Sequence, residues 1–252
     1  METNSHFKGK SVLKHIKDAR YKGKSAAGEG HGIDTPGHIA SAADAAKDTA
    51  ICTLLIWIIA NALKLPHKQI YVLFSLFIFG FLLWKIGRSA ILAWFRLEHI
   101  NNLIEDEKYE IENNRKEERD ELMQMYQTKG FAGSLLDKVV DVLMSDDNKL
   151  LGLMLEEEFG IALETYEHPL KQALGTAIGV FLSACALSIG IISSEDNGLF
   201  FAGFIVIFIS SYIIATIEQL NILNSVVWNL AIGFLASFGT YFIAQFIVGN
   251  IL

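Results

Sequence analysis

Four glutamates recur at helical spacing in the middle of the chain. Glu107 and Glu110 form a first pair three residues apart, and Glu118 and Glu121 form a second pair eleven residues later. On one α-helix, at about 100° per residue, the four carboxylates fall within an arc of about 80°. Like charges in this arrangement repel unless solvent screens them or a cation lies along the stripe. The pattern is typical of a cation-binding surface, and the alternative is an ordinary solvated acidic face.

A thioether accompanies carboxylates further along the chain. Met154 is followed by Glu157 and Glu158 at i+3 and i+4, so one helical face carries sulfur and oxygen donors. Oxygen ligands alone suit Mg²⁺ or Ca²⁺, whereas a sulfur ligand favours a softer first-row ion such as Fe²⁺, Mn²⁺ or Zn²⁺. The alternative is that Met154 is a core residue and that the glutamates face solvent.

The segment that carries these residues is strongly acidic. Residues 97–167 hold 19 of the 28 acidic residues and seven of the 21 basic ones, a net charge of −12, and the rest of the chain is at +5. Such a block repels nucleic-acid phosphates, so we expect no nucleic-acid partner. Glycines and a Ser-Asp-Asp run divide the segment into three predicted helices, at about 98–126, 132–144 and 148–159.

Long uncharged runs flank the acidic segment. Residues 173–194, 198–217 and 221–252 contain no charged side chain. Each run is long enough, as a helix, to cross a hydrocarbon core of about 30 Å. Two further spans precede the segment, at 49–63 and 70–95. The sequence therefore predicts an all-α membrane protein of five transmembrane helices, with a three-helix cytosolic metal-binding domain inserted between the second and third.

Asp48 lies at the edge of the first predicted span. That span must extend back through Asp48 to cross the bilayer, because its uncharged part covers only about 22 Å. An ionisable residue at membrane depth is a functional candidate on physical grounds alone, so Asp48 is singled out here; its place on a transport path is what the resemblance given below implies. The alternatives are an ion pair with Lys85 or Arg88, two basic residues of the second predicted span, or exposure at the membrane surface.

The charge distribution predicts an orientation. Eight basic residues precede the first uncharged run, which places the N-terminus and the acidic domain in the cytosol and the C-terminus on the opposite side. We expect no signal peptide, because the first apolar run begins far from the N-terminus. The predicted parts are a flexible basic arm at 1–38, transmembrane helices 1 and 2 at 39–96, the acidic domain at 97–168 and transmembrane helices 3 to 5 at 169–252.

These motifs resemble the vacuolar iron transporter family of Fe²⁺/Mn²⁺ membrane transporters. In that family the insert carries two Glu-x-x-Glu pairs eleven residues apart, the second running into Glu-Leu-x-x-Ile-Tyr-x-x-Lys/Arg-Gly, and then a Met-Met-x-x-Glu helix. Residues 118–130 of this chain read ERDELMQMYQTKG, and residues 154–160 read MLEEEFG, with Leu155 in place of the second methionine. The resemblance implies the metal ligands Glu107, Glu110, Glu118, Glu121, Met154 and Glu158.

The resemblance also implies a mechanism. Members are homodimers whose ion path runs between the first and second helices of the subunits, and they export metal from the cytosol in exchange for protons. Asp48 matches the aspartate of the family's Gly-Ala-Asn-Asp-Gly motif in the first span, of which the other residues differ here. Arg88 stands where the second span of the family has a glutamate. The expected membrane is the plasma (inner) membrane in a bacterium or a vacuolar-type membrane in a eukaryote.

The leading functional prediction is a transporter that exports Fe²⁺ or Mn²⁺ from the cytosol, with Zn²⁺ as a further possible ligand. The chain has no glycine-rich phosphate loop and no credible Ser/His/Asp set, so we do not expect an enzyme. One alternative is a membrane-anchored metal-binding or sensing protein whose membrane domain does not conduct, which Lys85 and Arg88 favour. Another is a dimeric membrane scaffold whose acidic helices engage basic partners, which the specific glutamate spacing disfavours.

Overall fold

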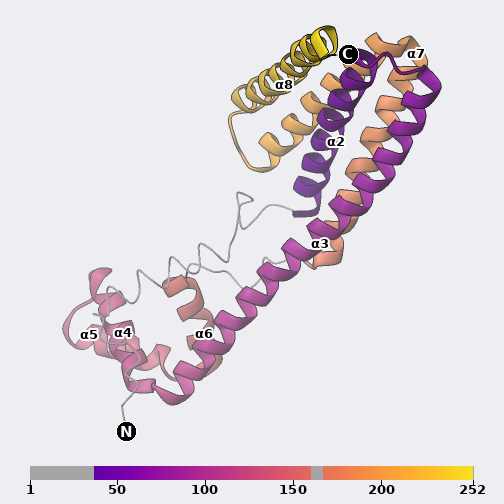
Figure 1. The fold of residues 1–252 in the computed structure, drawn as a ribbon. Helices are drawn as coiled ribbons and strands as arrows, with labels where there is room; N and C mark the ends of the chain where they lie inside the picture. The colour runs from indigo at the N-terminus through magenta and orange to yellow at the C-terminus, as the bar shows by residue number, and fades with distance from the viewer. Residues whose placement is uncertain (1–36, 160–166, 252) are drawn as a thin grey trace. The chain divides into compact units, whose positions relative to one another are not determined.

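The computed structural model describes residues 37–159 and 167–251 (Figure 1). Every regular element in these ranges is a helix, as the sequence predicts. The predicted basic arm lies outside them except for its last two residues, which begin the first helix. The helices are α2 (Gly37–Ala62), α3 (His67–Asn113), α4 (Arg115–Thr128), α5 (Gly133–Leu143), α6 (Asp147–Met154), η1 (Leu155–Phe159), α7 (Pro169–Ile217) and α8 (Ile222–Ile251).

The chain forms two compact units. The described part of the first, here called the insert unit, lies within Trp94–Tyr166, and the second, the membrane unit, comprises Asp34–Ala93 and Glu167–Leu252. Helix α3 contributes residues to both units. Its part beyond Ala93 carries Glu105, Asp106 and Glu107 in succession, which excludes that part from a hydrocarbon environment.

Four segments of the described chain are long and apolar enough to cross a membrane. They are His67–Asn113, Pro169–Ser194, Asn197–Ile217 and Ile222–Asn250. Two of them belong to α7, which folds back on itself: a Cβ added to Gly190 would lie 2.4 Å from the carbonyl oxygen of Gly198. Eight residues of straight helix would separate these two glycines by about 12 Å. The fifth predicted span corresponds to α2, which is not among the four.

Helix α2 packs mainly against α7 and α8. Its sequence is rich in alanine, the strongest helix former, and buried residues occur from Ala40 to Ala62. Two glycines of α7 allow the backbones to approach closely. A Cβ on Gly175 would lie 2.1 Å from the carbonyl oxygen of His38, and one on Gly179 would lie 1.9 Å from that of Ala42. This small-residue contact is the kind that joins helices in membranes, where apolar surface alone gives no driving force.

Substitution of Gly179 by alanine is therefore expected to destabilise the membrane unit. The added methyl group meets backbone rather than a flexible side chain, and such overpacking costs about 1–3 kcal/mol. Gly80 is the matched control, because a Cβ there meets no atom within 4 Å. In thermal unfolding of the detergent-solubilised chain, Gly179→Ala should lower the midpoint and Gly80→Ala should leave it unchanged or slightly raised. Equal midpoints for the two variants would contradict the close contact.

The insert unit has an apolar core built from its short helices. One buried cluster joins the end of α3 to α4, α5 and α6, and consists of Ile111, Leu122, Met125, Leu136, Val140, Leu150 and Met154. A second cluster joins α3 to the last helical turn before residue 160 and consists of Ile100, Leu103, Leu155 and Phe159. The two clusters fix α4 and η1 against α3, which is the helix that carries the first glutamate pair.

The prediction of one continuous helix over 98–126 is wrong. Helix α3 ends at Asn113 and α4 begins at Arg115, with Asn114 between them at φ −122° and ψ 33°. Asparagine is a poor helix former, and two occur in succession here. The backbone N–H of Asn114 still donates to the Glu110 carbonyl at 2.7 Å, and its own carbonyl accepts from Glu118 at 3.1 Å. The interruption is thus a kink in the helical ladder rather than a loop.

Candidate metal site and membrane ion pair

Four glutamates of the insert unit are almost completely buried. The exposed fractions of Glu107 and Glu158 are 1%, and those of Glu118 and Glu121 are 0%. Glutamate is almost never buried to this degree unless a partner compensates its charge. The fifth member of the predicted set, Glu110, is half-buried. Burial of this kind argues against the alternative of a simple solvated acidic face.

These side chains come from three helices rather than from one stripe. The first pair lies on α3, the second on α4, and Glu158 on η1. In an unbroken helix Glu121 would be about 21 Å along the axis from Glu107. The kink at Asn114 shortens that separation, since Glu118 and Glu121 both lie close enough to raise the pKa of Glu107 and α4 shares an apolar core with Ile111. The prediction that Glu107, Glu110, Glu118 and Glu121 share one helical stripe is therefore wrong, and the role of these residues as ligands stays a prediction.

Their mutual proximity is visible in the electrostatics of Glu107. Burial, followed by the charges of Glu158, Glu118, Glu110 and Glu121, raises the pKa of Glu107 from 4.5 to about 10. Desolvation and neighbouring like charges both disfavour the ionised carboxylate. The carboxyl group of Glu107 is therefore protonated at neutral pH, and each of the other four glutamates contributes to the shift of its pKa.

Neither carboxyl oxygen of Glu107 has a hydrogen-bond partner among the described residues. A buried polar group in this state costs about 1–3 kcal/mol. A divalent cation would compensate both the missing partner and the repulsion between the carboxylates. Within the described ranges, no group of three or more Asp, Glu, His or Cys side chains is arranged so that it could hold a metal ion. The buried glutamates are thus close enough to affect the pKa of Glu107, but in this conformation they do not form a metal site.

The turn that carries Glu158 is unusual. Residues Leu155–Phe159 form a π-helical turn that follows α6 directly. Such turns are rare and occur often at functional sites, because the wider turn redirects side chains. Glu157, beside Glu158, pairs with Lys129 and is half-buried. The predicted third helix at 148–159 is thus α6 extended by this turn.

Met154 is fully buried and belongs to the apolar core of the insert unit. Its neighbours there include Leu122, Met125 and Leu150. This apolar environment is the one expected if Met154 is a core residue rather than a metal ligand. Its role as a sulfur ligand stays a prediction.

Asp48 forms an ion pair inside the membrane unit. The Lys85 Nζ lies 2.6 Å from Asp48 Oδ2 and 3.7 Å from Asp44 Oδ2, and Lys47 lies 3.5 Å from Asp44 Oδ1. The Lys85 side chain is only 15% exposed, against 41% for Asp48. The ion-pair alternative considered for Asp48 is thus present. Arg88 is exposed and forms no ion pair with another residue in the described ranges.

Sequence reasoning missed Asp44 as a second carboxylate at this position. Asp44 precedes Asp48 by four residues, which places both on one face of α2. That i, i+4 spacing was the available sign. The two carboxylates share the Lys85 ammonium, so the membrane unit contains a small cluster of two acids and two lysines.

No curated protein matches the chain. A family model described as the VIT family, that of the vacuolar iron transporters, matches residues 93–245, more than half of the chain. The matched range includes the glutamate cluster, both halves of α7 and most of α8, whereas Asp48 and Lys85 precede it.

The family is one of membrane metal-ion transporters, which agrees only indirectly with the expectation of a non-enzyme. Its members carry divalent metal ions, and the apolar helices described above accord with a multi-pass membrane protein. The family match and the converging buried glutamates agree with the resemblance read from the glutamate motifs. The chain belongs to the VIT family.

Proposed function

We propose that this protein exports Fe²⁺ or Mn²⁺ from the cytosol and that the glutamate cluster of the insert unit collects the ions. The observation that carries the proposal is the burial of four glutamates from three helices, among them Glu107, whose oxygens have no hydrogen-bond partner among the described residues. Such a cluster is costly without a cation and stable with one. Glu107, Glu110, Glu118, Glu121 and Glu158 are the proposed oxygen ligands, and Met154 is the proposed sulfur ligand. Zn²⁺ is a further ion that this donor set would accept.

The proposed topology has five spans, with α2 as the first. At 26 residues, α2 is about 39 Å long, which is sufficient to cross the hydrocarbon core. The N-terminus and the insert unit would face the cytosol, and the C-terminus the opposite side. Two subunits would form a homodimer with the ion path between their α2 and α3 helices, and proton entry would drive export.

Asp48 is the proposed ligand of the transport path, and Lys85 is the obstacle to it. The Lys85 ammonium occupies the position that a metal ion bound to both Asp48 and Asp44 would take. A divalent ion must displace this ammonium before it can bind. Two charges repel strongly in a poorly hydrated site, by about 4 kcal/mol at 4 Å and an effective dielectric constant of 20. We therefore propose exchange between the tethered lysine and the transported ion.

A second candidate function rests on the same ion pair. If Lys85 never leaves Asp48, the protein binds metal in the insert unit without conducting it, as a membrane-anchored metal-binding or sensing protein would. The two candidates share the glutamate cluster and differ in the membrane unit. A binding measurement tests what they share, and a flux measurement separates them.

The shared basis is tested by Mn²⁺ binding to the full chain in equilibrium dialysis. Replacement of Glu118 by glutamine keeps the side-chain volume but removes one of the buried carboxylates of the cluster. We expect a loss of affinity of about tenfold or more, because a charge-assisted interaction contributes about 1.5–3 kcal/mol. The matched control is Glu112→Gln, which alters an exposed glutamate of α3 and should bind as the wild type does. Equal affinity for all three proteins would contradict the proposed collector.

A further inference from the structure

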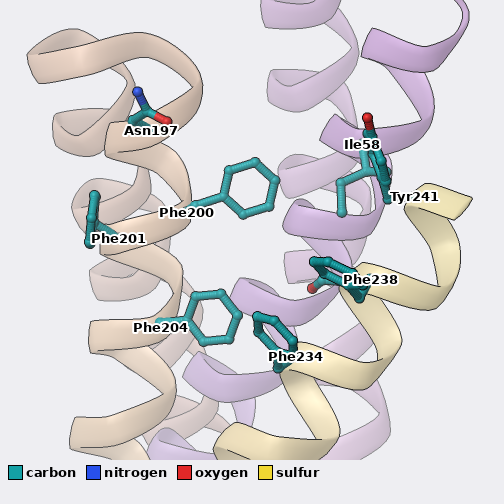
Figure 2. Close-up of a pocket in the computed structure, with 9 residues that line it drawn as sticks. Ile58, Asn197, Phe200, Phe201, Phe204, Phe234, Phe238 and Tyr241 are labelled. Carbon is teal, nitrogen blue, oxygen red and sulfur yellow. The ribbon is translucent and has the colours of Figure 1, made fainter.

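An aromatic cavity of about 460 Å³ lies within the membrane unit (Figure 2). It is lined by the second half of α7, by α8 and by Ile58 of α2. Five phenylalanines form most of its surface. Phe204 and Phe234 lie 6.2 Å apart between ring centroids, and Phe234 stacks on Phe238 at 5.0 Å. The volume is within the range of about 300–1,000 Å³ typical of small-molecule sites. Neither the family match nor the metal chemistry assigns a role to this cavity.

The polar lining residues lie at one end of the cavity. Asn197 is the first residue of the Asn197–Ile217 span, which ends at the turn between α7 and α8. Tyr241 lies on α8, at a comparable distance from the same turn. Each is about 30 Å from that turn along its helix, which is about the thickness of the hydrocarbon core. Both therefore lie near a membrane surface, and Phe204 and Phe234 lie deeper. Figure 2 shows Asn197 and Tyr241 at one end of the cavity and these two phenylalanines at the other.

The cavity opens sideways. Phe201 on its rim is 73% exposed, and Phe238 and Tyr241 are 49% and 47% exposed. At this depth the surroundings are acyl chains rather than water. Tyrosine at the rim is typical of the membrane interface, where its ring lies in hydrocarbon and its hydroxyl group contacts head groups. The occupant that this environment supplies is a lipid chain that enters from the bilayer with its polar end at the surface.

Ser237 distinguishes the cavity from a general lipid-facing surface. It is 5% exposed, it lines the cavity, and its hydroxyl group has no hydrogen-bond partner among the described residues. Two other span serines bond within their own helix: Ser211 donates to the Ile207 carbonyl at 2.7 Å and Ser188 to that of Ala184 at 2.8 Å. Ser183 also has no partner among the described residues, but it does not line the cavity. Ser237 lies one turn, about 5 Å, below Tyr241. A hydrogen-bond acceptor on the ligand at this depth would satisfy it.

We propose that the cavity binds a diacyl phospholipid from the leaflet on the side of residues 194–197. One acyl chain lies along the phenylalanines, an ester carbonyl accepts the hydrogen bond of Ser237, and the head group lies beside Asn197 and Tyr241. The ester carbonyls of a glycerophospholipid sit just below its head group, which matches the depth of Ser237. The site is thus selective for lipids that carry an acceptor at this position, in addition to an apolar chain.

The test uses the full chain in phospholipid vesicles that contain a small amount of a diester phospholipid with a photoreactive group in its acyl chain. After illumination, labelled peptides are mapped by mass spectrometry. We expect labelling concentrated near Phe204 and Phe238. The control position is Phe246, which lies on α8 as Phe238 does, is 70% exposed and does not line the cavity. Equal labelling at Phe246 and at the cavity would mean bulk lipid contact only and would overturn the proposal.

Competition then tests the hydrogen bond. An unlabelled diester phospholipid should reduce cavity labelling about fivefold more effectively than its diether analogue, the ratio for one neutral hydrogen bond. In Ser237→Ala, which preserves the cavity shape, the two competitors should be equal. Ser188→Ala, with its hydroxyl bonded within its own helix, should retain the wild-type preference. The proposal fails if the wild type does not distinguish the two lipids, or if a free fatty acid competes as well as the diester. It also fails if the peptides that line the cavity stay unlabelled while Phe246 is labelled, since a second copy of the chain or another occupant would then keep lipid out of the cavity.

Discussion

Replacement of Lys85 by methionine is expected to raise the affinity of the membrane unit for Mn²⁺ and to increase flux at low metal concentration by about tenfold or more. The substitution removes the ammonium that lies 2.6 Å from Asp48 and leaves two acidic side chains on the same face of α2. The Coulomb energy of a charge pair at this separation is a few kcal/mol even at an effective dielectric constant of about 20. Methionine also preserves the length of the side chain and adds a thioether donor.

Arg88→Met is the matched control for this prediction. Arg88 lies on the same helix, is exposed, and forms no ion pair with another described residue. Its removal changes the net charge by the same amount but should alter flux much less. If both variants behave alike, the effect is a general change of potential rather than release of Asp48. If Lys85→Met lowers flux, the lysine is needed for transport and the exchange mechanism is wrong.

Substitution of Glu107 by glutamine is expected to stabilise the metal-free protein and to abolish the pH dependence that this residue causes. The folded-state pKa of Glu107 is raised from 4.5 to about 10, by burial first and then by the neighbouring glutamates. Below pH 4.5 the carboxyl is protonated in both states. Between the two pKa values the unfolded chain releases the proton and the folded chain keeps it, so stability falls as pH rises. At pH 7 this contribution amounts to as much as about 3 kcal/mol.

Calorimetric unfolding of the full chain without metal, at pH values from 5 to 9, checks the prediction. The wild type should lose stability across this range, and Glu107→Gln should lose less and unfold at a higher temperature at neutral pH. Glu112→Gln is again the exposed control. A saturating concentration of Mn²⁺ should reverse the order, because the wild type gains stability from the ion and the glutamine variant gains much less. An identical pH dependence in both proteins would contradict the buried, protonated state.

The glutamates that the structure buries in the insert unit could be singled out from the sequence, because the Glu-x-x-Glu pairs depend only on residue type and spacing. Their arrangement could not. A prediction from helical periodicity assumes an unbroken helix. The two asparagines at 113 and 114 disfavour the helix only weakly, and whether it breaks there depends on the core formed by Ile111, Leu122 and Met125. The placement of Glu158 on a π-helical turn depends on the same tertiary packing.

Some features of the membrane unit could likewise be predicted from the sequence, and others could not. The apolar segments within α7 and α8 follow from uncharged length alone, and that within α3 follows from its hydropathy in spite of Lys85 and Arg88. The contact of Lys85 with Asp48 was one of several alternatives, and its contact with Asp44 was not predicted, because both depend on how α2 and α3 lie against each other. The cavity could not be predicted from the sequence, since its phenylalanines occur at spacings that any lipid-facing helix shows. Only the relation of α7 to α8 makes a site of them.

The most direct test of the central claim is Mn²⁺ flux through the full chain in proteoliposomes, with a dye that reports the ion on the far side of the membrane. The wild type should transport Mn²⁺ above the rate of protein-free vesicles, and Asp48→Asn should reduce the rate to that background while metal binding to the insert unit is retained. No flux from wild-type protein that still binds Mn²⁺ would contradict transport and leave the metal-binding or sensing function. Undiminished flux in Asp48→Asn would place the path elsewhere.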